Sequence, residues 1–184
     1  MPNNAMKILL SPAKSLDFES VLPALVPTEP LFLEQTKKVH RELKKLKAKD
    51  LQQLMHISAD LAALNEERIK AFSMPFTVEN SRPAVYAFDG DVYKGLDVYS
   101  LAANQLKALQ ERLRILSGLY GMLRPLDLIQ PYRLEMGTSL SIAESRSLYE
   151  FWTSTLTNSL EKELSADEMV VNLASKEYSK AVAL

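Results

Sequence analysis

Three short apolar segments alternate along this chain with longer segments in which apolar residues recur at helical spacing. The short segments cover residues 7–11, 84–88 and 169–173, and their length and composition predict β-strands. Strands that are separated by helices favour a parallel or mixed sheet with helices on its faces. We therefore predict an α/β (mixed α+β) fold that is built on a central mixed sheet flanked by helices.

The predicted helices follow from apolar spacing and from residues that can cap a helix. Capping candidates such as Asp50, Ser58 and Ser147 precede several of the periodic segments. A short strand is also expected at 133–136. The predicted helices cover about 30–47, 50–57, 58–72, 101–116 and 147–164, with a very short one after Ser175.

Composition limits the class of protein that this chain can be. With 184 residues, 47% of them hydrophobic and 24% charged, the chain is predicted to form one soluble domain. Its apolar runs are too short for a bilayer span or a secretory signal. The lack of cysteine excludes disulfides, thiolate nucleophiles and cysteine-ligated metals, and it favours a cytoplasmic location. His40 and His56 are not spaced as metal ligands, so neither a metal nor another cofactor is expected.

The formal net charge of −1 does not indicate nucleic-acid binding, so such a function has to rest on local clusters of charge. One basic run is interrupted by a single acid, Glu42. A run of this kind is usually the solvated face of a helix, and the alternative is non-specific affinity for nucleic acid. It consists of Lys37, Lys38, Arg41, Lys44, Lys45, Lys47 and Lys49.

All five glycines lie between Gly90 and Gly137, and two of them fall in a segment that resembles the hairpin of helix-hairpin-helix DNA-binding motifs. Two glycines at such a turn expose backbone N–H groups, which can bind a phosphate without reading bases. The alternative is a glycine-capped helix turn. The candidate phosphate-binding residues of this segment are Ser117, Gly118, Tyr120 and Gly121, and nearby arginines could add charge at positions Arg112, Arg114, Arg124 and Arg133.

Polar side chains recur where predicted strands end. In a sheet whose strands run the same way, these ends meet at one edge and form a cleft. Taken singly, each group also fits a helix cap, a plain turn or a structural ion pair. Together they would suit a phosphate-bearing partner; the groups are Ser11 with Lys14, Asp89 with Asp91, Arg133 with Glu135, and Asn172 with Ser175 and Lys176.

Several of these segments together resemble the YaaA family of peroxide-stress-resistance proteins. The resemblance extends from Met6 to about Lys180, and the long run 113–137 is its most specific part. Met6 matches the usual start of the family, so residues 1–5 are expected to be an extension. Family members continue for about another third of their length, so a C-terminal part is expected to be missing from a single domain at 6–184. The other matching segments are 11–17, 87–96 and 172–178.

The family resemblance implies a cytosolic protein that limits oxidative damage, by lowering free intracellular iron. It also implies DNA binding through a positively charged cleft and a helix-hairpin-helix element, and a mixed α/β fold peculiar to the family. By position, that element falls on residues 117–121.

Two functions follow as hypotheses. The first is a non-enzymatic protein that binds double-stranded or branched DNA through phosphate contacts. The second is an enzyme that acts on a phosphorylated or nucleotide-like ligand in the strand-end cleft, with Asp89, Asp91 or Glu135 as acid, base or metal ligand. Direct iron binding by these acids is a third idea, with no histidine or cysteine to support it. The predicted phosphate contacts are Ser11, Lys14, Arg112, Arg114, Ser117, Gly118, Tyr120, Gly121, Arg124, Arg133 and Lys176.

Overall fold

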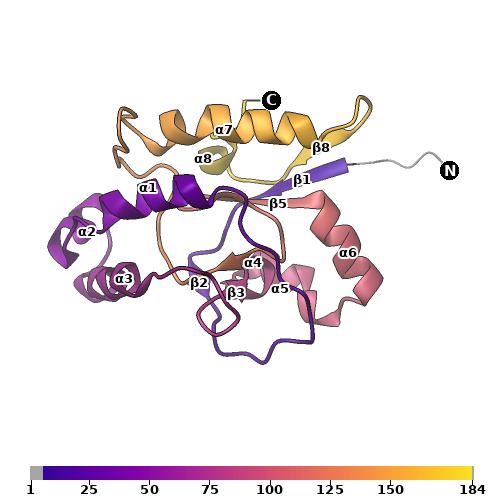
Figure 1. Ribbon diagram of the computed structural model, residues 1–184, viewed down its shortest axis with the longest axis horizontal. Coiled ribbons are helices and arrows are strands. Elements are labelled where there is room, and N and C mark those ends of the chain that lie inside the picture. Colours follow the sequence, from indigo (N-terminus) through magenta and orange to yellow (C-terminus); the bar gives the residue numbers. More distant parts are fainter. Residues whose placement is uncertain (1–5, 184) are drawn as a thin grey trace.

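The computed structural model describes residues 6–183 and contains a mixed four-stranded sheet in the order β6-β5-β1-β8 (Figure 1). Strand β1 (Met6–Leu10) pairs in parallel with β5 (Leu113–Ser117) on one side and with β8 (Met169–Asn172) on the other. Strand β6 (Gly121–Leu123) is antiparallel to β5. The three parallel strands therefore end at the same edge of the sheet.

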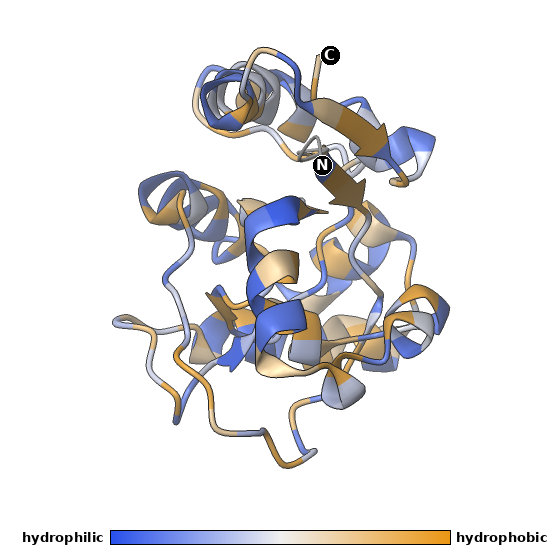
Figure 2. Cartoon of the chain, turned by 90° about the vertical axis from the view of Figure 1, so that its right-hand side faces the viewer, coloured by the Kyte–Doolittle hydropathy of each residue, from blue (hydrophilic) through white to orange (hydrophobic). Residues whose placement is uncertain are grey.

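The central part of the sheet is buried because β1 and β5 are mostly apolar on both faces, whereas the edge strand β8 is partly exposed. Leu9, Ile115 and Leu116 are fully buried. Helix α7 (Leu148–Glu163) packs through residues that include Trp152, and it lies along one side of the sheet in Figure 1. Figure 2 shows the strands near both chain ends in the colour of hydrophobic residues.

Three helices follow one another behind β1, as the sequence predicted. They are α1 (Leu33–Leu43), α2 (Ala48–Met55) and α3 (Ala59–Ala71). The Ser58 side chain accepts a hydrogen bond from the Leu61 N–H, which is the predicted cap of α3. His40 has a structural role, because its Nε2 lies 2.8 Å from the Ile69 carbonyl oxygen and its ring stacks on Phe72.

Two predicted elements are wrong in type. Residues 84–88 form a short helix, α4 (Ala84–Ala87), followed by the two-residue strand β4 (Phe88–Asp89). An apolar run that is buried on every side does not distinguish a strand from a helix. The predicted helix over 101–116 is divided into helix α6 (Ala103–Arg112) and strand β5.

A third predicted element is absent, because residues 133–136 form no strand.

The remaining elements are short. Helix α5 (Asp91–Leu96) follows β4, and a 3-10 turn covers Val98–Ser100. Helix α8 (Lys176–Ser179) follows β8. The two small antiparallel pairs are β2 (Ser15–Leu16) with β4, and β3 (Arg82–Pro83) with β7 (Leu128–Ile129).

Candidate functional site at the strand ends

The ends of β1 and β8 are joined by direct hydrogen bonds between the residues that follow them. The Ser175 N–H donates to Ser11 Oγ at 2.9 Å, and the two hydroxyl oxygens lie 3.3 Å apart. These residues are 164 positions apart in the chain. Asn172 has a local role, because its side-chain oxygen accepts the Ala174 N–H.

A cavity of about 620 Å³ opens beside these serines. The β2–β4 pair places Ser15 opposite Asp89, so the loop that carries Asp89 and Asp91 forms one wall. The loop 10–15 and residues 173–175 line the rest. The Tyr93 hydroxyl donates to the Ser11 carbonyl at 2.8 Å. Burial raises the pKa of Tyr93 well above its usual value, so this hydroxyl remains a proton donor.

A second cavity of about 230 Å³ shares Ser11, Lys14 and Ser175 with the first. Its wall contains Arg133 and Glu135 from the irregular segment after β7. Lys14 Nζ lies 2.8 Å from Glu135 Oε1, and an Arg133 nitrogen lies 3.5 Å from Glu135 Oε2. We call the two cavities together the strand-end cleft. The fold therefore gathers four segments that are distant in the sequence, and Arg133 and Glu135 form an ion pair inside their meeting place.

The turn at residues 117–121 connects two strands, β5 and β6, and not two helices. The predicted helix-hairpin-helix element at this position is therefore wrong. Ser117, Gly118, Tyr120 and Gly121 are all buried, so their backbone groups do not face a partner. The Gly118 carbonyl accepts the indole N–H of Trp152 at 2.9 Å. Two helices joined by a short connection do occur elsewhere, at α2 and α3.

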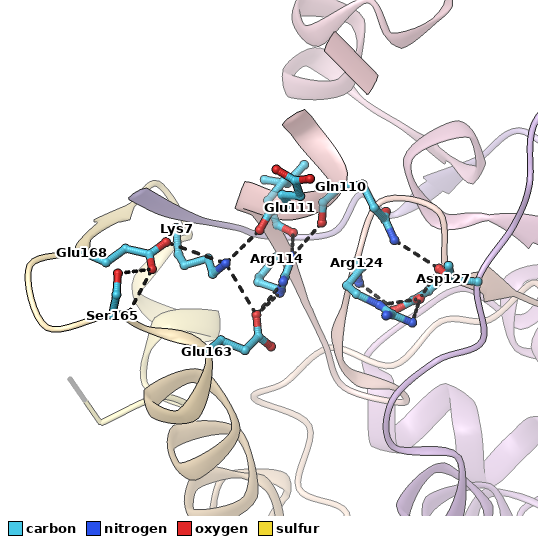
Figure 3. A network of polar contacts seen from close by, with 11 residues as sticks. Lys7, Gln110, Glu111, Arg114, Arg124, Asp127, Glu163, Ser165 and Glu168 are labelled. Carbon is cyan, nitrogen blue, oxygen red and sulfur yellow. Dashed lines mark hydrogen bonds and ion pairs between the residues drawn. The ribbon is translucent and has the colours of Figure 1, made fainter. Parts of the chain in front are cut away.

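Two of the arginines predicted to contact DNA are held in structural ion pairs (Figure 3). Arg114 is buried and donates from Nε to Glu163 at 2.8 Å, next to Lys7. Arg124 donates from Nε to the fully buried Asp127 at 3.0 Å. Arg112 and Lys176 are exposed, and neither lines the strand-end cleft.

Comparison with known proteins decides the family. The family model described as peroxide stress protein YaaA matches residues 6–184. The chain belongs to the YaaA family. A UPF0246 protein of Flavobacterium johnsoniae is 58% identical over 177 residues, which cover 96% of this chain and 70% of the relative. UPF0246 proteins of Flavobacterium psychrophilum and Alteromonas mediterranea are 56% and 52% identical, over the same 96% of this chain and over 70% and 69% of their own lengths.

Membership in the YaaA family supports a role in oxidative stress. Among residues 6–183, no three histidine, aspartate or glutamate side chains lie close enough together to hold a metal ion. None of the helices in that range is long and apolar enough to span a membrane.

The basic run of this YaaA-family protein lies on α1, on the connection to α2 and at the start of α2, with every member exposed. Lys37 pairs with Glu34, and Lys45 pairs with Glu42. The other five have no carboxylate within 4.0 Å among the residues that the structure describes. We call these five the basic face; they are Lys38, Arg41, Lys44, Lys47 and Lys49.

Sequence reasoning missed two residues of the cleft region. Glu177 lines the smaller cavity, and its Oε1 accepts the Gly137 N–H at 2.9 Å. Arg68, on α3, is half-buried and contacts a crevice that Arg133 also lines. No local pattern marks Arg68, because an arginine in an amphipathic helix resembles any solvated one. Only the packing of α3 against the segment after β7 brings it to this place.

Proposed function

We propose that this YaaA-family protein binds DNA, double-stranded or branched, in the response to peroxide, and that phosphates lie along the basic face. The observation that carries the proposal is the set of five exposed cations without a carboxylate partner within 4.0 Å in the described part of the chain. Unpaired surface lysines and arginines bind DNA by displacing condensed counterions, with no need to read bases.

Other candidate contacts fit this proposal unequally. Arg112 and Lys176 are exposed and remain available to phosphate, whereas Lys14 is exposed but pairs with Glu135 at 2.8 Å. Arg114 and Arg124 are already paired with Glu163 and Asp127, so freeing either guanidinium would leave a carboxylate without its partner. The proposal therefore assigns DNA contact to surface cations and not to the buried turn at 117–121. The family resemblance adds that the protein limits DNA damage by lowering free iron.

The test is a fluorescence-anisotropy titration of the whole chain with duplex and four-way-junction DNA at several salt concentrations. The variant Lys38→Glu/Arg41→Glu/Lys44→Glu removes three cations of the basic face. Its affinity should fall roughly tenfold or more, and its salt dependence should be shallower by about three in slope.

The matched control, Lys107→Glu/Lys162→Glu/Lys180→Glu, makes the same change in net charge at three exposed lysines on other elements. It should keep most of the wild-type affinity. Absence of binding at low salt, or an equal loss in the control, would contradict DNA binding through the basic face.

A further inference from the structure

Two arginines line the same narrow crevice next to the strand-end cleft. Arg68 comes from α3 and Arg133 from the segment after β7, and both line one narrow crevice with Tyr132. Burial, together with the positive charge of Arg133, lowers the pKa of Arg68. Like charges held at such a place cost free energy unless an anion lies near both.

Few carboxylates of the protein lie near these two arginines. Glu135 is 3.5 Å from Arg133, but it also binds Lys14 at 2.8 Å. Arg133 Nε is buried and has no hydrogen-bond partner within residues 6–183. Arg68 has no carboxylate within 4.0 Å among residues 6–183. Lys14 and Arg133 therefore share one carboxylate, and Arg68 has none within 4.0 Å in the described part of the chain.

Two of the other acids that line the cleft, Glu177 and Asp89, have partners elsewhere. Glu177 holds the Gly137 N–H, and it is not within 4.0 Å of Lys14, Arg68 or Arg133. Asp89 lies 3.6 Å from Lys94 of α5. Neither Glu177 nor Asp89 therefore pairs with Lys14, Arg68 or Arg133.

We propose that Arg68 and Arg133, with Lys14, bind the phosphate group of a nucleotide whose remaining part lies in the larger cavity of the strand-end cleft. A guanidinium presents several N–H donors in a plane that matches phosphate oxygens. The larger cavity has about 620 Å³, which is within the usual range for small-molecule sites. Asp89 and Asp91 on its wall are acceptors for the hydroxyl and amino groups of a nucleoside.

This nucleotide site does not rest on DNA binding by the basic face. Its test is calorimetric titration of the whole chain with the four ribonucleoside 5′-monophosphates, with inorganic phosphate, and with adenosine. At least one monophosphate should bind more tightly than inorganic phosphate, and adenosine should bind more weakly than its monophosphate. Absence of monophosphate binding, or binding no tighter than that of inorganic phosphate, would overturn the nucleotide site.

The variants Arg68→Gln and Arg133→Gln should weaken monophosphate binding by roughly tenfold to a hundredfold, because each removes a charged hydrogen-bond donor. Arg112→Gln is the matched control, since Arg112 is exposed at the end of α6 and lines neither cavity. Equal losses in Arg112→Gln, or none in the other two variants, would overturn the assignment. Lys38→Glu/Arg41→Glu/Lys44→Glu should retain nucleotide binding, which separates this site from the DNA proposal.

Stability without ligand distinguishes a binding arginine from a structural one. If Arg68 is placed to meet a ligand, Arg68→Gln relieves repulsion, and the Tm of the unliganded variant should equal or exceed that of the wild type. The Tm increase that the monophosphate gives the wild type should be lost. A lower unliganded Tm would assign Arg68 a structural role and overturn the proposal. Arg133→Lys keeps the charge without the planar fork, so it should fold and still bind the monophosphate more weakly.

Discussion

Gly118 and Gly121 lie where a side chain has no room. A Cβ on Gly118 would overlap the carbonyl oxygen of Leu134. A Cβ on Gly121 would come within 2.6 Å of the Trp152 ring, and the backbone there has φ of 75°, a left-handed conformation that favours glycine. Close packing of the β5–β6 turn against α7 and the segment after β7 therefore accounts for both glycines.

Gly121→Ala should destabilise the protein by roughly 2–4 kcal/mol, because it adds both left-handed strain and a clash in the core. Gly95→Ala is the matched control, since nothing lies within 4 Å of the added methyl group and the residue belongs to α5. The control should be neutral or slightly stabilising. Urea unfolding of both variants measures this difference, and a near-neutral Gly121→Ala would contradict the packing explanation.

The helices that the sequence predicted best are those with a clear apolar stripe and a capping residue. Helix α7 buries Leu148, Trp152, Leu156 and Leu160, and Ser147 caps it by accepting the Glu150 N–H. By contrast, Leu113 and Leu116 continue the helical spacing of α6, and no glycine or proline occurs in residues 101–117 to mark the end of the helix. Helical periodicity alone therefore extended α6 into what is β5, because pairing with β1 overrides local propensity.

The prediction that polar residues at strand ends lie close together was more accurate than the prediction of secondary structure for each segment. Ser11 and Ser175 follow real strands, and Asp89 belongs to one, although the helix α4 replaces most of that predicted strand. Arg68 could not be predicted, because its place depends on contact between α3 and residues far away in the sequence.

Ser147→Ala tests the cap at the scale of the helix. The variant should lose about 1 kcal/mol of stability, because the N–H of Glu150 loses its acceptor. Ser154→Ala, at an exposed position within the same helix, should be neutral or slightly stabilising. Equal unfolding free energies for the two variants would show that Ser147 does not hold the start of α7.

For the whole molecule, the parallel order β5-β1-β8 is what assembles the cleft. It places the ends of β1 and β8 together, and the β2–β4 pair adds the wall with Asp89. The basic face lies on α1, α2 and the connection between them, which are separate from the segments that line the strand-end cleft. The two proposed phosphate-binding surfaces are therefore formed by different elements: the basic face is open and helical, and the strand-end cleft is recessed.

The most direct test of this arrangement is an engineered disulfide, because the natural chain has no cysteine to interfere. Ser11 and Ser175 are changed together to cysteine, and their side-chain oxygens lie 3.3 Å apart in the folded protein. On mild oxidation of dilute protein, the double variant should form an intramolecular disulfide with faster migration on a non-reducing gel, and neither single variant should. A double variant that stays reduced, or that forms only disulfide-linked dimers, would contradict the convergence of the strand ends.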